Sequence, residues 1–119
     1  MGNFNAKGNE MRSLIAEGDF SSRLLLQELL TPYGECHIAV NGKEAASAHR
    51  MALDAGQPYG MICLNIMMSE MDGHAALEEI RALEELKGIG STHGAKIAMI
   101  TALGDINNVS AAYERLCDG

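Results

Sequence analysis

The stretch Met61–Gly73, MICLNIMMSEMDG, decides the fold of this chain. Its first four residues are apolar, so both faces of the strand that they predict are apolar too. Such two-sided apolarity is typical of a central strand in a parallel sheet that helices cover above and below. The run ends in Asn65, and a loop then closes on Asp72 and Gly73. The stretch therefore predicts a buried central strand with a neutral amide at its carboxyl end.

Three further apolar runs predict the other strands, at Leu14–Ala16, Cys36–Val40 and Ala95–Thr101. Segments with helical spacing follow each of these strands, which gives the order βαβαβαβα. Strands that alternate with helices form parallel sheets with right-handed crossovers. The sequence therefore predicts an α/β domain with a doubly wound parallel sheet.

Capping residues and leucine spacing place the first two helices. Ser21 and Ser22 are candidate N-caps of the first helix, whose apolar residues are Leu25, Leu26, Leu29 and Leu30. Asn41 and Glu44 have the capping-box spacing at the start of the second helix, which is expected to end near Ala55.

A third helix is expected to begin after Asp72, which can cap it. Its apolar stripe consists of Ala76, Leu77, Ile80, Leu83 and Leu86. The charged residues of this segment are expected to face solvent: Glu78, Arg81, Glu84, Glu85 and Lys87. A fourth helix is expected to begin at Asp105.

Length and composition narrow the class of protein. The chain has 119 residues, 47% of them hydrophobic, which suffices for one core and one domain. Its formal net charge of −7 argues against nucleic-acid binding, which needs clustered Lys and Arg. No apolar run approaches the about 18 residues that cross a membrane. Residues 1–10 lack the apolar centre of a secretion signal, so we expect a flexible lead-in to a cytoplasmic domain over residues 11–119.

The cysteines and histidines do not indicate a metal or redox site. Cys36, Cys63 and Cys117 are far apart in the sequence and form no Cys-x-x-Cys pair, and the four histidines lack ligand spacing. The cysteines are expected to be small buried apolar residues.

Polar residues stand at the carboxyl ends of three expected strands, where doubly wound sheets carry their functional sites. They are Glu17, Gly18 and Asp19 after the first strand, Asn65 after the third and Thr101 at the end of the fourth. We expect these five residues to lie together at the end of the sheet that the carboxyl ends of its strands form.

Three motifs in this order resemble the receiver domain of bacterial response regulators, which has the flavodoxin-like fold. They are AEGDFSSRLLL, ICLNIMMSEMDG and IAMITA, and the resemblance runs from about Arg12 to Gly119. The family has a pair of acidic residues in the first motif, Asp-x-x-Met-Pro-x-Met-Asp-Gly in the second, and an apolar run ending in Thr-Ala in the third. The resemblance implies a sheet with strand order 2-1-3-4-5.

The resemblance also implies a chemistry. Receiver domains take a phosphoryl group from a partner histidine kinase onto an aspartate at the end of the third strand. A divalent cation, usually Mg²⁺, offsets the repulsion between that carboxylate and the phosphoryl oxygens, and carboxylates and one backbone carbonyl hold the ion. A Thr or Ser hydroxyl and a Lys bind the phosphoryl oxygens. Receiver domains are not enzymes in the ordinary sense, so we do not expect this chain to be an enzyme.

Carried onto this chain, the pattern is incomplete. Asn65 stands at the phosphoacceptor position, and its neutral amide cannot form a stable aspartyl phosphate. Gly18 replaces the first acid of the pair, which leaves Asp19 as a weak metal ligand beside the backbone carbonyl of Met67. Glu17 stands one position earlier, and the resemblance leaves its reach to the ion open. We therefore expect Mg²⁺ binding to be very weak or absent.

Other family features are changed as well. Ser69 stands where the family has Pro, Thr101 matches the switch hydroxyl, and the sequence ends before the Lys of a fifth strand and the helix after it. With no fifth strand, the fourth would be an open apolar edge. We therefore expect self-association through the fourth strand and fourth helix, beside partners such as a histidine kinase or an output protein.

Three functions stay open at this point. The leading hypothesis is a receiver domain that acts as a protein-interaction module without accepting phosphate. The second is an ordinary phosphoaccepting receiver inactivated by mutation or engineering at Asn65 and Gly18. The third is a small α/β enzyme or nucleotide binder; against it, the sequence has no Gly-x-Gly-x-x-Gly after the first strand and no Gly-Lys-Ser/Thr motif.

Overall fold

The computed structural model describes residues 12–66, 68, 71–90 and 94–100 of the chain. Over these residues it has four parallel strands in the order β2-β1-β3-β4. The strands are β1 (Ser13–Ala16), β2 (Cys36–Ala39), β3 (Met61–Asn65) and β4 (Lys96–Ile100). The predicted doubly wound α/β sheet is confirmed, and the strand order is the one that the receiver resemblance implies.

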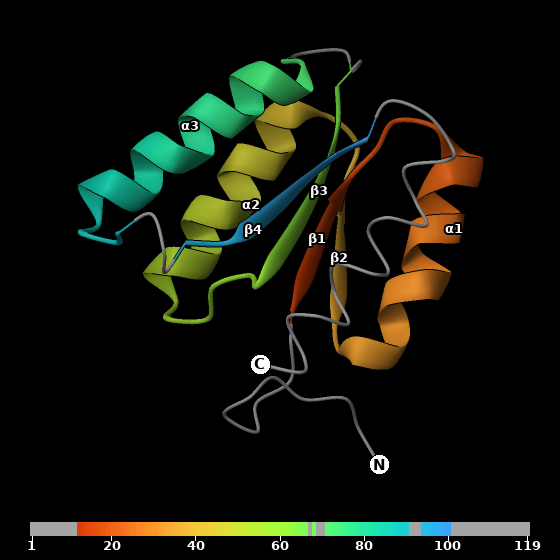
Figure 1. Ribbon diagram of the computed structural model, residues 1–119, viewed down its shortest axis with the longest axis horizontal. Coiled ribbons are helices and arrows are strands. Elements are labelled where there is room, and N and C mark those ends of the chain that lie inside the picture. Colours follow the sequence, from red (N-terminus) through yellow and green to blue (C-terminus); the bar gives the residue numbers. More distant parts are fainter. Residues whose placement is uncertain (1–11, 67, 69–70, 91–93, 101–119) are drawn as a thin grey trace.

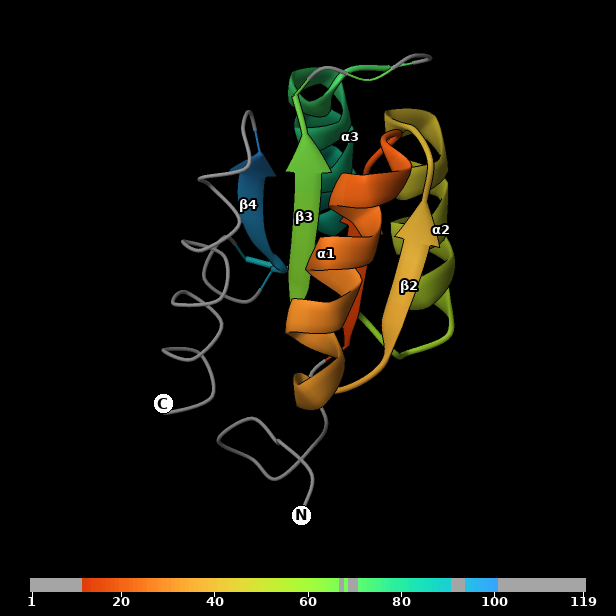
Figure 2. The same ribbon diagram turned by 90° about the vertical axis from the view of Figure 1, so that its right-hand side faces the viewer.

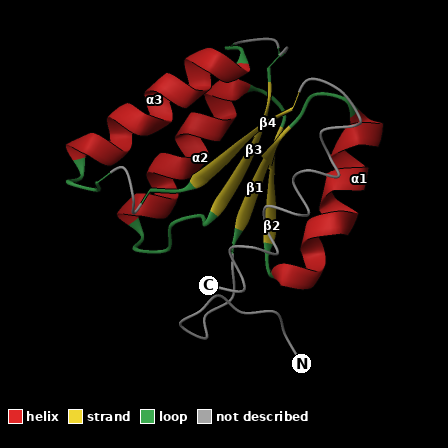
Figure 3. Ribbon diagram, viewed as in Figure 1, coloured by secondary structure: helices red, strands yellow, loops and turns green. Residues whose placement is uncertain are grey.

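Helices cover both faces of this sheet (Figure 1). They are α1 (Phe20–Leu30), α2 (Gly42–Asp54) and α3 (Gly73–Leu86), and a short 3₁₀ helix, η1 (Thr31–Tyr33), follows α1. The helix α1 lies on one face, whereas α2 and α3 lie side by side on the other, as the view turned by 90° also shows (Figure 2). Coloured by structure, the chain is a three-layer α/β/α arrangement (Figure 3).

The core has one apolar cluster on each face of the sheet. On the α1 side, Ile15, Leu26 and Leu30 pack with Met61 and Cys63, and all five are buried. On the other side, the sheet packs against the alanines of α2 and the inward residues of α3, with Leu14, Ile62, Leu64, Ala76 and Ile80 among the buried residues. β3 is therefore buried on both faces, as its apolar sequence predicts.

Two expected helix caps are confirmed, and one is replaced. Asn41 accepts a hydrogen bond from the Glu44 backbone N–H at 2.8 Å, and Asp72 accepts one from Ala75 at 2.9 Å. The first helix begins earlier than expected, because Asp19 caps it by accepting from the Ser22 N–H at 2.9 Å. The expectation that Ser21 or Ser22 caps α1 is therefore wrong, since Asp19, two and three residues earlier in the sequence, fills that role.

Two residues of α3 face the opposite way to the expectation. Leu86 is 84% exposed, whereas Glu84, expected in solvent, is 3% exposed. Glu84 follows Ala76 and Ile80 at intervals of four residues, so it continues the buried face of the helix. A carboxylate is tolerated there because it accepts three hydrogen bonds, one of them from the Ala95 N–H.

The outer surface of α1 is partly apolar. Leu25, one of the leucines with helical spacing, is 40% exposed, and Leu24 and Phe20 on the same helix are 45% and 66% exposed. The expected fourth helix, with Asp105, lies outside the described residues, as do residues 1–10. None of the helices among the described residues is long and apolar enough to span a membrane.

Candidate functional site

The candidate site lies at the carboxyl ends of β1 and β3, which are neighbours in the sheet. Asn65 is the last residue of β3, and Glu17 follows β1 directly. The Asn65 amide donates through Nδ2 to both carboxylate oxygens of Glu17, each at 2.7 Å. The structure thus joins Asn65, which the resemblance aligns with the phosphoacceptor, to the acid whose reach the sequence left open.

Glu17 is held in place on several sides. It is 1% exposed, its backbone N–H donates to the Ala39 carbonyl at 3.0 Å, and its Oε1 accepts from the Asp19 N–H at 3.0 Å. The Arg23 guanidinium donates to the Glu17 backbone carbonyl at 3.1 Å. A buried carboxylate needs hydrogen-bond donors, and the Asn65 amide supplies the one that comes from the neighbouring strand.

The charge of Glu17 also fixes the orientation of the Asn65 amide. An amide oxygen facing a carboxylate oxygen at 2.7 Å would be repulsive, so the NH₂ group has to face Glu17. The partial positive charge of the amide NH₂ attracts the Glu17 carboxylate, as a cation attracts the carboxylates of a cluster. An aspartate at this position would instead place a second carboxylate against Glu17.

Asp19 has a structural role in this arrangement. It is exposed, and its carboxylate caps α1 through the Ser22 N–H. Hydrogen bonds from the Ser22 backbone and side chain hold the pKa of Asp19 below its usual value. The carboxylate that the resemblance assigns to the metal is thus engaged in capping the helix.

Gly18 leaves room for a side chain. A Cβ atom at this position would lie 3.5 Å from the Val40 carbonyl oxygen, which is an ordinary contact, and the residue is exposed. No special backbone geometry requires glycine here. The first acid of the family pair is therefore missing for a reason other than lack of space.

The start of α3 closes the site from the other side. A Cβ at Gly73 would lie 2.6 Å from the Asn65 carbonyl oxygen, and the Gly73 N–H donates to the Ile66 carbonyl at 3.0 Å. The Asp-Gly pair of the opening motif is therefore explained: Asp72 caps α3, and Gly73 lets the helix approach the strand end closely.

The carboxylates at this end of the sheet are few and already hydrogen-bonded. The described residues contain no group of three or more His, Cys, Asp and Glu side chains placed to hold a metal ion. Glu17 is already bonded to Asn65, and Asp19 caps a helix. Of the family's Mg²⁺ ligands as the resemblance assigns them, Asp19 is a carboxylate that caps a helix, Gly18 and Asn65 supply none, and Met67 lies outside the described residues.

Other expected site residues lie outside the described part of the chain: Thr101, Met67 and Ser69. The structure brings their neighbours close, because the Ile66 N–H donates to the Ile100 carbonyl at 3.0 Å. It therefore places the end of β4 beside the end of β3, one residue before Thr101.

Sequence reasoning missed the Asn65–Glu17 pair. The only signal was that Glu17 directly follows a strand with four buried residues, so that its side chain can reach the neighbouring strand. Among the cysteines, Cys63 is buried, as expected, and burial raises its pKa to about 12. Cys36 is partly exposed, and Cys117 lies outside the described residues.

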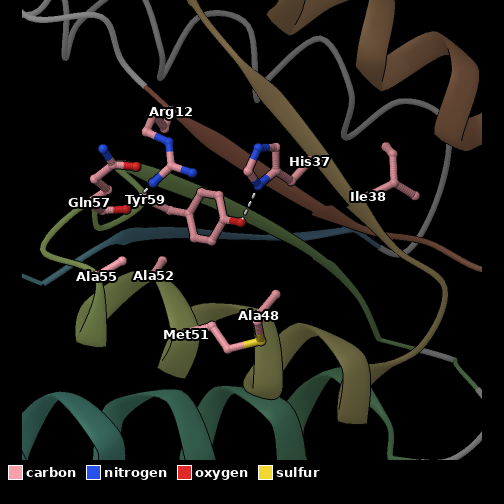
Figure 4. Close-up of a pocket in the computed structure, with 9 residues that line it drawn as sticks. All are labelled: Arg12, His37, Ile38, Ala48, Met51, Ala52, Ala55, Gln57 and Tyr59. Atoms are coloured by element: carbon pink, nitrogen blue, oxygen red, sulfur yellow. Dashed lines mark hydrogen bonds between the residues drawn. The ribbon is translucent and has the colours of Figure 1, made fainter.

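A groove of about 510 Å³ opens at the opposite end of the sheet, between β2 and α2 (Figure 4). Its polar groups are already paired with one another. The Arg12 guanidinium donates to Glu35 and to the Gln57 carbonyl, and the Tyr59 hydroxyl is 2.5 Å from His37 Nδ1. The polar groups of the groove thus bond to one another at the amino ends of the strands. The groove is not part of the candidate site, which lies at the carboxyl ends.

No protein-family model and no curated protein matches this sequence. Solved structures do. A variant of the receiver domain of the histidine kinase CKI1 from Arabidopsis thaliana is 24% identical, with a TM-score of 0.66 over 86% of this chain and 75% of the other. CKI1's receiver domain has also been solved with Mg²⁺ and BeF₃⁻.

Two bacterial structures agree with this match. The CheX–CheY–BeF₃⁻–Mg²⁺ complex from Borrelia burgdorferi matches with 23% identity and a TM-score of 0.64, over 86% of this chain and 74% of the other. The receiver domain of a signal transduction histidine kinase from Syntrophus aciditrophicus matches with 21% identity and a TM-score of 0.64, over 92% and 91%. Fold, strand order and these matches agree: the chain has the fold of the response regulator receiver domains.

Proposed function

We propose that this chain is a receiver-type protein-interaction domain of two-component signalling that does not accept a phosphoryl group at Asn65. The observation that carries the proposal is the pair of hydrogen bonds from Asn65 Nδ2 to Glu17. They place a neutral amide at the acceptor position and engage it with the nearest carboxylate. Among the residues that the structure describes, neither an attacking carboxylate nor an unengaged carboxylate pair for a metal is left at that point.

The cation follows the same reasoning. CKI1's receiver was solved with Mg²⁺, but in this chain Glu17 and Asp19 already bond to Asn65 and to α1. We therefore propose that Mg²⁺ binding is very weak or absent. Millimolar Mg²⁺ should leave the NMR signals of Asp19 and Asn65 unchanged, and saturable shifts at both residues would contradict this.

The partner is expected to be a protein of a two-component pathway, either a histidine kinase or an output protein. CheY from Borrelia burgdorferi was solved in complex with CheX, a protein partner. In this chain, the helix α1 begins directly after Asp19 and carries three exposed apolar side chains, Phe20, Leu24 and Leu25. Such a patch supports a protein-binding surface, because soluble domains rarely expose neighbouring apolar side chains without a partner.

A small phosphodonor tests the proposal. The parent chain, incubated with acetyl phosphate and Mg²⁺, should stay unmodified by intact-mass spectrometry. A hydroxylamine-labile phosphoryl group on the parent would contradict it. The variant Gly18→Asp, which keeps Asn65, is the matched control and should also stay unmodified.

The room at Gly18 favours a second candidate, a phosphoaccepting receiver that was inactivated at two positions. Asn65→Asp alone and Asn65→Asp with Gly18→Asp distinguish the candidates. An acyl phosphate on the double variant would favour the inactivated receiver. Failure of a folded double variant to gain one would favour the interaction module.

A further inference from the structure

A buried polar cluster lies at the end of the sheet opposite to Asn65. His49 of α2 is completely buried, and its Nε2 is 3.0 Å from Glu84 Oε2 of α3. The same carboxylate accepts from the Ala95 N–H at 2.9 Å and from Arg81 Nη1 at 2.7 Å. Because Ala95 directly precedes β4, Glu84 ties two helices to the start of that strand.

The cluster fixes the tautomer of His49. A carboxylate only accepts, so Nε2 carries the hydrogen and Nδ1 is the bare nitrogen. That Nδ1 is buried and has no hydrogen-bond partner among the described residues. A proton added to His49 would therefore sit on a buried N–H with no acceptor, which is costly.

The titratable and charged groups around His49 come from several elements. Glu84 and Arg81 lie on α3, and the Tyr59 ring, from the segment before β3, stacks on His49 with centroids 6.3 Å apart. The Tyr59 hydroxyl is engaged with His37 of β2, and the Arg12 guanidinium lies over the Tyr59 ring, 5.0 Å from its centroid (Figure 4). None of these contacts brings an acceptor to His49 Nδ1.

The backbone near Ala95 is shaped around the carboxylate. A Cβ at Gly94 would lie 2.7 Å from Glu84 Cδ and 2.8 Å from Arg81 Nη1. Glycine thus allows the loop after α3 to pass close to the buried pair. The start of β4 is thus held close to the end of α3.

We propose that His49 and Glu84 form a pH-sensitive clamp, which holds the start of β4 against α2 and α3 while His49 is neutral and weakens when His49 takes up a proton. The clamp goes beyond the proposed function and does not depend on it, since it involves neither Asn65 nor Glu17.

Electrostatics agree with this geometry. Burial lowers the pKa of His49 below its ordinary value, although Glu84 opposes the shift. Burial alone would raise the pKa of Glu84, but hydrogen bonds from Ala95, Arg81 and His49 outweigh it and lower that pKa. A lowered pKa means that the unfolded chain binds the proton first, so stability falls as the pH falls. For His49 this loss of stability begins below about pH 6.5, and for Glu84 only below about pH 4.3, the ordinary pKa values of the two side chains.

The test compares urea unfolding of the full chain at about pH 7.5 and about pH 5 with that of His49→Gln, which keeps a donor for Glu84 but cannot titrate. As the pH falls over this range, protonation of His49 in the unfolded chain should by itself raise the unfolding equilibrium constant by up to about 30-fold. His49→Gln should lose this part of the pH dependence. Exposed His74→Gln, on α3, is the matched control and should keep it.

An NMR titration of the parent chain needs no variant. The ¹⁵N shifts of His49 should report the Nε2–H tautomer and neutrality at pH values where the unfolded chain is protonated. When His49 does titrate, hydrogen exchange of the Ala95 amide, corrected for its intrinsic rate, should accelerate. Protonation of His49 at or above its ordinary pKa, or an unchanged pH dependence in a folded His49→Gln, would overturn the proposal.

Discussion

At the scale of single residues, Asn65 decides what the site can do. Its side chain donates to both oxygens of Glu17, a carboxylate that is 1% exposed. The amide therefore meets the hydrogen-bonding needs of a buried carboxylate that forms no salt bridge with the described residues. Under the proposed function, an amide in place of the acceptor carboxylate also removes the need for a metal at this point.

Replacing Asn65 by Asp should reverse this balance. At neutral pH and in EDTA, the free energy of unfolding should fall by about 1–3 kcal/mol, because two carboxylates then share one buried site. One of them is expected to take up a proton or a cation in the folded state. The folded variant then binds one proton more than its unfolded chain does. The loss of unfolding free energy relative to the parent should therefore shrink as the pH falls towards about 5. Added Mg²⁺ should reduce this loss as well.

Urea unfolding measures this, with Asn41→Asp as the matched control. Asn41 is the N-cap of α2, where Asp caps equally well, so the same chemical change should have little effect there. If Asn65→Asp were as stable as Asn41→Asp in EDTA at neutral pH, the role given to the amide would be wrong.

At the scale of elements, α3 joins the two ends of the sheet. Its first residue, Gly73, approaches the Asn65 carbonyl, and Glu84, near its last turn, bonds the Ala95 N–H. Helix caps and apolar spacing predict where this helix lies. They do not predict that a glutamate continues its buried face.

The glycines after α3 test how closely this connection is packed. Gly94→Ala should lower the free energy of unfolding by about 1–3 kcal/mol, because its Cβ would displace the Glu84 carboxylate. Gly90→Ala, in the same connection, meets nothing within 4 Å and should be neutral or gain up to about 1 kcal/mol. Thermal or urea unfolding of the two variants decides, and equal stabilities would refute the close packing.

At the scale of the whole molecule, the order of the strands leaves two outer strands. In the described part of the chain, β2 pairs with β1 alone and β4 with β3 alone. The Lys96 N–H donates to Gly60, so Lys96, Ala98 and Ile100 face β3, and the peptide groups of Ile97 and Met99 point away from it. Outward peptide groups on an apolar strand can pair with another chain.

Self-association through β4 should therefore be measurable. In sedimentation velocity, the average sedimentation coefficient of this chain should rise with concentration. Met99→Pro, which removes an outward N–H without breaking the ladder to β3, should reduce that rise. Ile38→Pro, the matched change on the β2 edge, should not; a monodisperse monomer at all concentrations would contradict the expectation.

The sequence alone determines the α/β fold, because apolar runs and segments with helical spacing alternate along the chain. Both patterns reflect which side chains of a local segment are buried. The sequence also identifies Asn65, Gly18 and Asp19 by their places after strands. Only the tertiary structure decides what these residues touch: Asn65 bonds Glu17 across 48 positions of sequence, and His49 meets Glu84 across 35. Such pairs depend on strand order and helix packing, which bring distant side chains together, and no local pattern records them.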